Sequence, residues 1–242
     1  MSETYYAGAY WSCRKDSAEE CARRAESFFH LLSRRDSIYA QWFEQADSRK
    51  KALQLPFEPT YDTFMRFFGR RTYREGKDGF SFSAWTGHKE DGHGGMVMLR
   101  CGSAAEFVSN SCLLYLPHSG PAVERVLTVP VLKEVIRALV LAWEPEWAVV
   151  TSHEFRDTLS EDGRVGTFVG WMTYFSHDRG ELPSLPEPVR VEPVEDKGSL
   201  LLLTSGRLTA SNPEHLSQGR RVQAVLQGEG LLKPVIPRQQ AG

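Results

Sequence analysis

The chain has 242 residues, of which 41% are hydrophobic and 25% are charged, a composition typical of globular proteins with one large domain or two small ones. Its formal net charge at pH 7 is -2. Because this charge supplies no global positive field to attract a polyanion, the composition argues against a nucleic-acid-binding protein.

The amino-terminal part of the chain is predicted to begin with a strand and a capped helix. Tyr5–Trp11 is aromatic and small, as a strand would be. Ser17 and Glu20 form a capping-box pattern, after which apolar residues recur at helical spacing on one face. Residues 38–43 are predicted to form a second strand, followed by a basic turn or short helix at 48–51.

A second helix and a group of strands follow. Tyr61, Phe64 and Phe68 share one face of the predicted helix, and Gly69 supplies its terminator. The pattern then changes to period two with glycine punctuation, which predicts a meander of antiparallel strands. These strands are expected at residues 80–84, 96–100 and 112–116.

A long apolar helix is predicted to begin at Pro130 and to end near Pro145. Two further strands are expected after it, at residues 147–151 and 165–175, separated by a charged segment at 154–164. The order of these elements continues the alternation of helices and strands seen earlier in the chain.

The carboxy-terminal part begins with a proline-rich, acidic interval at residues 176–193, which is predicted to be a loop or linker. Residues 189–191 and 199–203 are expected to pair as strands around a short turn. Asn212 then caps a final helix that has Pro213 at its first position.

These elements predict the fold class. Because the strands are short, turn-linked and partly alternating, they favour an α+β fold over a doubly wound parallel sheet. We expect one mostly antiparallel sheet packed by amphipathic helices, as a single domain over residues 1–230, with a flexible tail at 231–242. The alternative is a two-lobed arrangement split near residue 125.

The cysteines and the amino terminus bear on the compartment. Cys13, Cys21, Cys101 and Cys112 show no CxxC pair or zinc-type spacing, which predicts small buried side chains rather than a disulfide framework. The first residues lack a signal-peptide pattern, and no segment approaches about 18 uninterrupted apolar residues. We therefore expect a cytoplasmic, soluble protein without a membrane partner.

One glycine-rich loop gathers residue types that can bind metal. His88, Glu90, Asp91 and His93 lie close together in the sequence. A metal site needs converging side chains with bonds of about 2 Å and second-shell support, and a glycine-rich hairpin tip supplies little rigidity. The residues leave open a solvated loop, a contact with a partner, and a metal-dependent enzyme that uses the His88/His93 loop.

Other catalytic patterns are absent from the sequence. His153 and Glu154 match half of a zinc-protease helix, but Asp157 stands where the second histidine would be. No GxSxG elbow, P-loop or GxGxxG fingerprint occurs. Cys112 and His118 are a conceivable nucleophile and base. We predict no catalytic residue, no bound metal and no cofactor.

Local charge suggests where a partner would bind. Acidic groups on a nearly neutral protein can complement a basic, DNA-gripping partner, although charged segments are most often simply solvated. The predicted partner-binding residues are Glu154, Asp157, Glu161, Asp162, Asp178 and Glu181. The basic clusters at 49–51 and 70–74 are expected to be solvated surface. The six tryptophans are expected mostly in the core, with one or two at an interface.

Several stretches together form a recognisable pattern. They are YYAGAYW near the start, CARRAESFF, WFEQADSRKKAL, GWMTYFS, and VRVEPVED followed by LTSGRLTASNPEH. In these stretches, which extend from about residue 5 to residue 230, the chain resembles the bacterial immunity protein 52 family, which accompanies polymorphic toxins. The resemblance is specific by its extent, since none of the stretches is a catalytic motif.

The resemblance implies a non-enzymatic antitoxin of α+β fold that binds and neutralises its cognate toxin. In this family the toxin is often a nuclease of restriction-endonuclease-like fold, delivered by a type VI secretion system. The family supplies no residue-level binding motif, so the predicted partner-binding residues rest on charge and loop placement. The competing hypotheses are a metal-dependent enzyme and a nucleic-acid adaptor.

Overall fold

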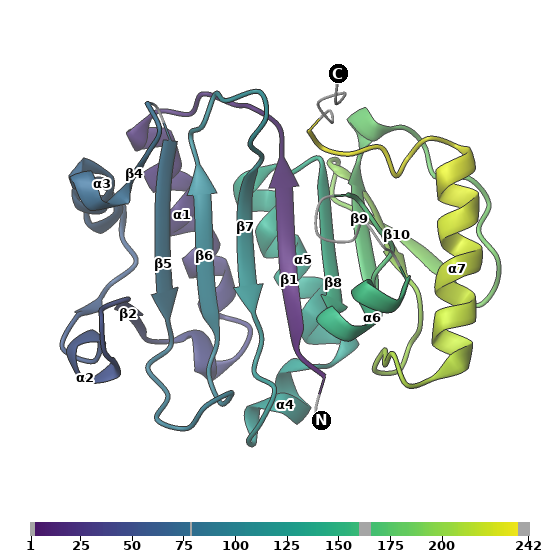
Figure 1. Cartoon of the computed structure of the whole chain (residues 1–242), viewed down its shortest axis with the longest axis horizontal. Helices are drawn as coiled ribbons and strands as arrows, with labels where there is room; N and C mark the ends of the chain where they lie inside the picture. The colour runs from purple at the N-terminus through teal and green to yellow at the C-terminus, as the bar shows by residue number, and fades with distance from the viewer. Residues whose placement is uncertain (1–2, 78, 160–165, 237–242) are drawn as a thin grey trace.

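The computed structural model describes residues 3–77, 79–159 and 166–236 (Figure 1). Within these ranges, eleven strands form one sheet in which every neighbouring pair is antiparallel, and seven α-helices pack around it. The predicted α+β class, with a mostly antiparallel sheet and amphipathic helices, is confirmed.

The sheet has a strand order that differs from the chain order. Across the sheet the strands are β10 (Arg190–Val194), β11 (Gly198–Leu202), β9 (Met172–Ser176), β8 (Trp147–Ser152), β1 (Tyr5–Trp11), β7 (Asn110–Tyr115), β6 (Met96–Cys101), β5 (Gly79–Trp85), β2 (Trp42–Glu44) and β3 (Pro56–Phe57), with β4 (Arg74–Glu75) also paired to β5.

The first strand of the chain lies in the middle of this sheet. On one side β1 pairs with β7, where Tyr6 lies opposite Tyr115, and on the other side it pairs with β8, where Tyr6 lies opposite Thr151. The strands that precede and follow residue 125 therefore belong to one continuous sheet, and β1 is the strand that joins them (Figure 1).

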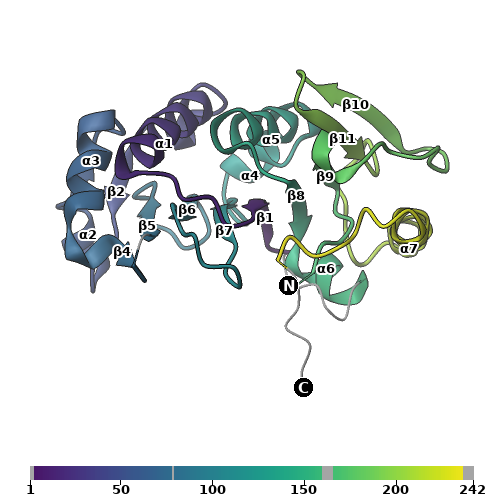
Figure 2. The same cartoon turned by 90° about the horizontal axis from the view of Figure 1, so that it is seen from above.

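Helices cover the two faces of the sheet unequally. Figure 2 shows α1 (Ala18–Ser33) and α5 (Val129–Trp143) on one side, and α6 (His153–Leu159) and α7 (Pro213–Gly228) on the other. Gly219 allows α7 to approach α6 closely, since a Cβ there would lie 2.9 Å from the ring of Phe155. The remaining helices are α2 (Arg49–Ala52), α3 (Tyr61–Gly69) and α4 (Ala122–Val126).

The core forms where the predicted apolar faces meet. Helix α1 begins at the capping box of Ser17 and Glu20, as predicted, and buries Phe29 completely. The ring centroid of Phe29 lies 4.8 Å from that of Trp42 and 5.3 Å from that of Phe64 in α3. Such aromatic pairs each add about 0.5–1.5 kcal/mol beyond the area they bury, so they anchor the helical layer firmly to the sheet.

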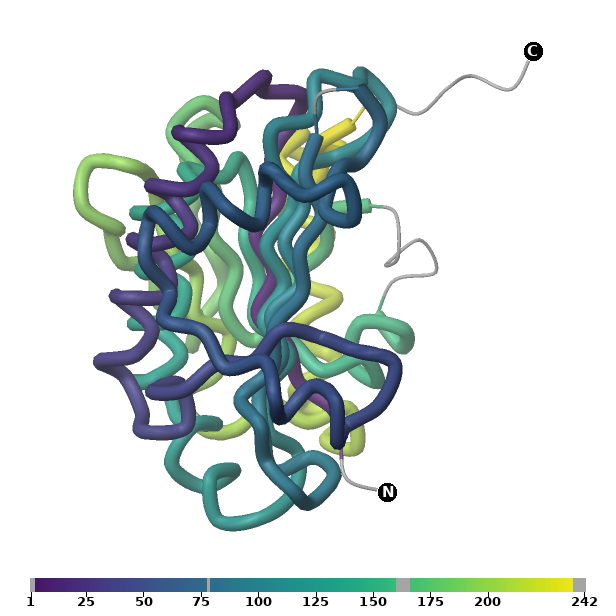
Figure 3. The backbone as a smooth tube through the Cα atoms, turned by 90° about the vertical axis from the view of Figure 1, so that its left-hand side faces the viewer, coloured from purple at the N-terminus to yellow at the C-terminus, as the bar shows by residue number. Residues whose placement is uncertain are grey.

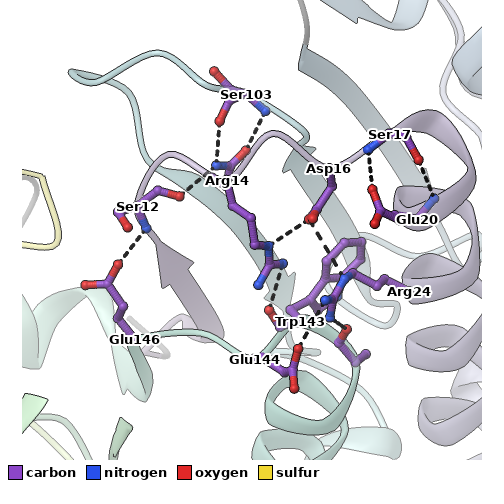
Figure 4. A network of polar contacts seen from close by, with 12 residues as sticks. Ser12, Arg14, Asp16, Ser17, Glu20, Arg24, Ser103, Trp143, Glu144 and Glu146 are labelled. Carbon is purple, nitrogen blue, oxygen red and sulfur yellow. Dashed lines mark hydrogen bonds and ion pairs between the residues drawn. The ribbon is translucent and has the colours of Figure 1, made fainter. Parts of the chain in front are cut away.

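A polar network fastens the end of β1 to the end of α5 (Figure 4). The guanidinium of Arg14 donates to the Trp143 carbonyl at 3.0 Å, and that of Arg24 donates to the Ala142 carbonyl at 2.9 Å. Asp16, which is largely buried, accepts from Arg14 at 2.8 Å. The two cations satisfy carbonyls that a helix terminus leaves unpaired and complement the helix dipole.

The predicted residue ranges of two strands were wrong. Instead of a strand at residues 38–43, the chain forms a 3-10 turn, η1 (Ser37–Tyr39), and only then enters β2. The reason is that the Asp36 carboxylate accepts from the Ile38 amide and caps the turn. The strand expected at 165–175 begins only at Met172, and residue 165 lies outside the described residues.

Three further features differ from the sequence-based expectations. The short helix α4 was not predicted. Cys13 is exposed, whereas the other three cysteines are buried as expected. Leu231, just beyond the predicted domain end at residue 230, is buried in the core, and the Leu231 carbonyl accepts from Arg179 at 3.1 Å.

No helix within the described residues is both long enough and apolar enough to span a lipid bilayer.

The close packing at Gly8 predicts that β1 tolerates no larger side chain there. A Cβ at this position would lie 2.8 Å from the Tyr10 hydroxyl and 2.9 Å from Leu113, and Tyr10 is stacked on Trp147 at 5.0 Å. Gly8→Val should therefore lower the free energy of unfolding by about 1–3 kcal/mol, measured by urea denaturation. The control is Gly206→Ala, where a Cβ would meet nothing within 4 Å. Equal stability of the two variants would contradict this packing.

The ion pair of Asp36 predicts a pH-dependent stability. Arg125 donates to the Asp36 carboxylate at 2.9 Å, and this hydrogen bond is the main reason that the pKa of Asp36 lies below its usual value. A lowered pKa in the folded state gives stability that is present above the unfolded-state pKa and is lost as the pH falls through the folded-state value. Asp36→Asn should therefore destabilise the protein at pH 7, and the difference should shrink below about pH 4. Urea denaturation at both pH values tests this, and an undiminished difference in acid would contradict it.

Candidate functional site

No helix of the described residues covers the side of β5, β6 and β7 that faces away from α1 and α5 (Figure 1); we call this side the open face. Strand pairing places Trp85, Met96 and Tyr115 in one row across this open face, with Met98 and Leu113 side by side in the next row. All five are partly exposed, and the side chain of Met98 is 40% exposed. The open face thus presents aromatic and methionine side chains where a solvated sheet face would normally carry polar ones.

The aromatic row continues into β1 and α6. Tyr6 lies opposite Tyr115, and its ring stacks on the imidazole of His153 at a centroid distance of 4.7 Å. The guanidinium of Arg156 lies 5.9 Å from the Tyr6 ring centroid. Burial raises the pKa of Tyr6 to about 12, so its hydroxyl stays neutral at physiological pH.

A groove of about 750 Å³ lies at the end of the open face where Trp85, Met96 and Tyr115 form a row. Trp85, Met96 and Tyr115 line it from the sheet, Arg49 lines it from α2, and His153 lines it from the start of α6. Figure 3 shows the backbone from the side, with the segments of α2 and α6 on the side of the sheet opposite α1. The groove therefore joins residues that lie far apart in the sequence.

The loop at residues 86–95 forms another wall of this groove and is firmly held. The Gly95 amide donates to the Thr86 hydroxyl at 2.9 Å, and the His118 amide donates to the Gly92 carbonyl at 2.9 Å. The Ser119 hydroxyl donates to the backbone carbonyl of Asp91 at 2.7 Å. These bonds tie the loop to residues 118–119, which the sequence-based expectation of a glycine-rich tip with little support did not include.

The two histidines of this loop do not converge. His88 lines the groove, with its Nδ1 atom 3.0 Å from the Thr86 hydroxyl. His93 lies against Gly120, where a Cβ would come within 2.6 Å of its ring. Among the described residues, no group of three or more His, Cys, Asp and Glu side chains is arranged to hold a metal ion.

The conceivable nucleophile Cys112 faces the interior. Its side chain is completely buried in β7, and burial raises the pKa of its thiol well above the usual value. His118, which follows the end of β7, lines the groove instead. A buried neutral thiol is a poor nucleophile. Cys112 and His118 therefore do not form a nucleophile–base pair.

The charged side chains around the groove differ in how many contacts they make with their neighbours. The guanidinium of Arg49 donates to the His88 carbonyl and lies 5.7 Å from the Trp85 ring centroid. It is 3.8 Å from the Asp91 carboxylate, which is fully exposed. Glu90 is also exposed and lines the groove. Among the residues that line the groove, these two carboxylates stand against the one guanidinium of Arg49. Lys89 is exposed in the same loop but does not line the groove.

The first group of predicted acidic residues lies partly beside the groove. Glu154 and Asp157 are exposed on α6, directly after His153. Glu154 accepts from the Thr4 amide at 3.1 Å, and Asp157 accepts from Arg156 at 2.8 Å. The predicted residues Glu161 and Asp162 lie outside the described residues.

The second predicted acidic group lies elsewhere. Asp178 is in η3 (His177–Arg179), and Glu181 follows it; both are exposed. They follow the end of β9 that pairs with Trp147 at the start of β8, whereas α6 follows the other end of β8. The structure therefore places Glu154 and Asp157 at the opposite end of the β8–β9 pair from Asp178 and Glu181.

Sequence reasoning did not identify the open face or the groove. A signal was available, because Trp85, Met96, Met98, Leu113 and Tyr115 all fall on the strand positions that alternate with the core residues. The expectation that most tryptophans are buried was correct: all but Trp85 are at most 2% exposed. Trp85 is thus the tryptophan available to a partner.

Comparison with known proteins gives a family and a fold. The family model for immunity protein 52 matches residues 3–235, which is nearly the whole chain. The solved structure of the Pseudomonas aeruginosa T6SS protein PA0821 is similar, with a TM-score of 0.61 and 12% sequence identity over 99% of this chain and 77% of that one. No curated protein matches the chain.

The separation of His88 from His93 predicts that the fold does not depend on metal. Adding Zn²⁺ or a chelator to the purified protein should leave its Tm unchanged, because no bound ion would contribute to folding. The double variant His88→Ala/His93→Ala should likewise show no change in response to either reagent. A rise in Tm with Zn²⁺ that is lost in the double variant would contradict this reading.

Proposed function

Because the chain belongs to the immunity protein 52 family, we propose that this immunity protein binds and neutralises a cognate toxin that is a nuclease of restriction-endonuclease-like fold, delivered by a type VI secretion system. Binding occurs in the cell that carries both proteins. The single observation that carries the proposal is the family match over nearly the whole chain.

The open face supports a binding role. Aromatic residues, methionine and arginine are the side chains enriched in protein interfaces, and the row from Trp85 to Tyr6 with Arg49 and Arg156 at its two ends contains all three kinds. A standard interface buries about 800 Å² on each partner. Because sheet pairing already fixes the backbone of this row, only the side-chain rotamers would have to be ordered when the toxin binds.

The acidic residues support a basic partner. A nuclease needs a positively charged surface to grip DNA, and Glu154 and Asp157 lie on α6 beside the open face. Asp178 and Glu181 are farther from it, so they would act mainly through longer-range attraction, which raises association rates more than final affinity. Glu161 and Asp162 remain part of the proposed acidic surface.

The proposed mechanism is stoichiometric masking. The immunity protein covers the DNA-contacting face of the toxin and excludes the substrate, with no covalent bond made or broken. A second route, in which binding blocks an assembly that the toxin needs, uses the same preformed surface. Both differ from the metal-dependent enzyme built on the His88/His93 loop, which would inactivate many toxin molecules per molecule of protein.

Titration separates these mechanisms. The toxin for this test is the product of the open reading frame next to the gene for this chain, and its DNA cleavage is measured against increasing amounts of the immunity protein. We expect cleavage to end at a molar ratio of about one, because tight binding consumes one molecule per toxin. His93→Ala, which removes one histidine of the alternative metal pair and is not part of the groove lining, should titrate identically. Full protection far below equimolar amounts, or loss of protection in this variant, would contradict stoichiometric binding.

A further inference from the structure

We propose that the groove at the end of the open face receives an arginine side chain of the toxin. This inference rests on the proposed function, since it assigns part of the same interface. The floor of the groove consists of Met96 and Tyr115, flanked by Trp85. An arginine side chain is long enough to lay its aliphatic stem on such a floor while its planar guanidinium stacks on an aromatic ring.

The open face already holds arginines in this manner. The Arg49 guanidinium lies over Trp85 at 5.7 Å from the ring centroid, and the Arg156 guanidinium lies over Tyr6 at 5.9 Å. Tyr115 lies between these two pairs in the same row, and no arginine or lysine of the described residues makes a cation–π contact with it. Its ring centroid lies 6.4 Å from that of Tyr6 and 6.2 Å from that of His153, and the part of the ring that stays exposed lines the groove.

The rim of the groove selects for positive charge. The Asp91 carboxylate is fully exposed, and its ion-pair distance to Arg49 is a long 3.8 Å. The Glu90 side chain is exposed beside it. An incoming guanidinium can donate to these carboxylates in a forked geometry. An acidic side chain would be repelled by them, and a purely apolar one would bury them without a partner.

The rim carboxylates are also well positioned, because the bonds that hold the loop use backbone atoms. The carbonyl of Asp91 accepts from Ser119, and the carbonyl of Glu90 accepts from the His93 amide. Side-chain substitutions at residues 90 and 91 therefore leave the loop in place. Glu90→Gln/Asp91→Asn removes both charges with almost no change in shape.

A first experiment tests the groove without the toxin. Acetyl-arginine amide is titrated into ¹⁵N-labelled protein, and the indole signal of Trp85, assigned with Trp85→Phe, is followed by NMR. Acetyl-citrulline amide, which has the same shape but no charge, is the matched ligand. We expect the arginine ligand to shift the signal at concentrations at least about fivefold lower than citrulline, and Glu90→Gln/Asp91→Asn to abolish this preference.

A second experiment measures the affinity for the neighbouring gene product by calorimetry. Glu90→Gln/Asp91→Asn and Tyr115→Leu should each weaken binding by about tenfold to a hundredfold. The control, Glu19→Gln/Glu106→Gln, removes two exposed carboxylates, one on α1 and one in the β6–β7 loop, and should bind like the wild type. Circular dichroism melts confirm that each variant is folded.

The outcomes separate the two proposals. If the wild type does not bind the neighbouring gene product, the proposed function is wrong. The arginine titration alone then decides whether the groove binds an arginine side chain. If the wild type binds but Glu90→Gln/Asp91→Asn binds equally well, the groove assignment is overturned while the proposed function stands. Equal response to arginine and citrulline in the first experiment also overturns it.

Discussion

The constraint on which this structure depends is the insertion of β1 between β7 and β8. This strand is hydrogen-bonded on both sides, so it turns two groups of strands from distant parts of the chain into one sheet. The same strand contributes Tyr6 to the aromatic row, and the residues that follow it cap the end of α5. A change in β1 would therefore affect the core, the helical layer and the open face together.

This arrangement suits a protein that acts by shape and charge. Strand pairing fixes the backbone that carries the apolar side chains of the open face, and the loop at residues 86–95 is held by backbone bonds to residues 118–119. A preformed surface loses little conformational entropy on binding, which favours high affinity. In the proposed complex, the acidic residues on α6 and at the groove rim would attract a basic partner and discourage acidic ones.

Much of the fold could be predicted because its signals are local. The capping box at Ser17 and Glu20, the proline at the start of α7 and the alternation in β5 each act within a few residues. The site could not be predicted in the same way, because residues from Thr4 to His153 meet in the groove only after β1 is inserted. Alternation shows that Met98 and Phe82 face opposite ways, but only the placement of the helices shows which face stays open. The acidic residues predicted to bind a partner were chosen by local charge, and the topology separates Glu154 and Asp157 from Asp178 and Glu181.

The most direct measurement of the central claim, that this protein works through its open face, uses methionine methyl groups as reporters. Of the five methionines, Met96 and Met98 lie on the open face, whereas Met172 is buried and Met65 lies on α3. In NMR spectra of ¹³C-methyl-labelled protein saturated with deuterated toxin, the signals of Met96 and Met98 should shift and those of Met65 and Met172 should not. A stoichiometric complex in which Met96 and Met98 keep their free-state signals would contradict the account.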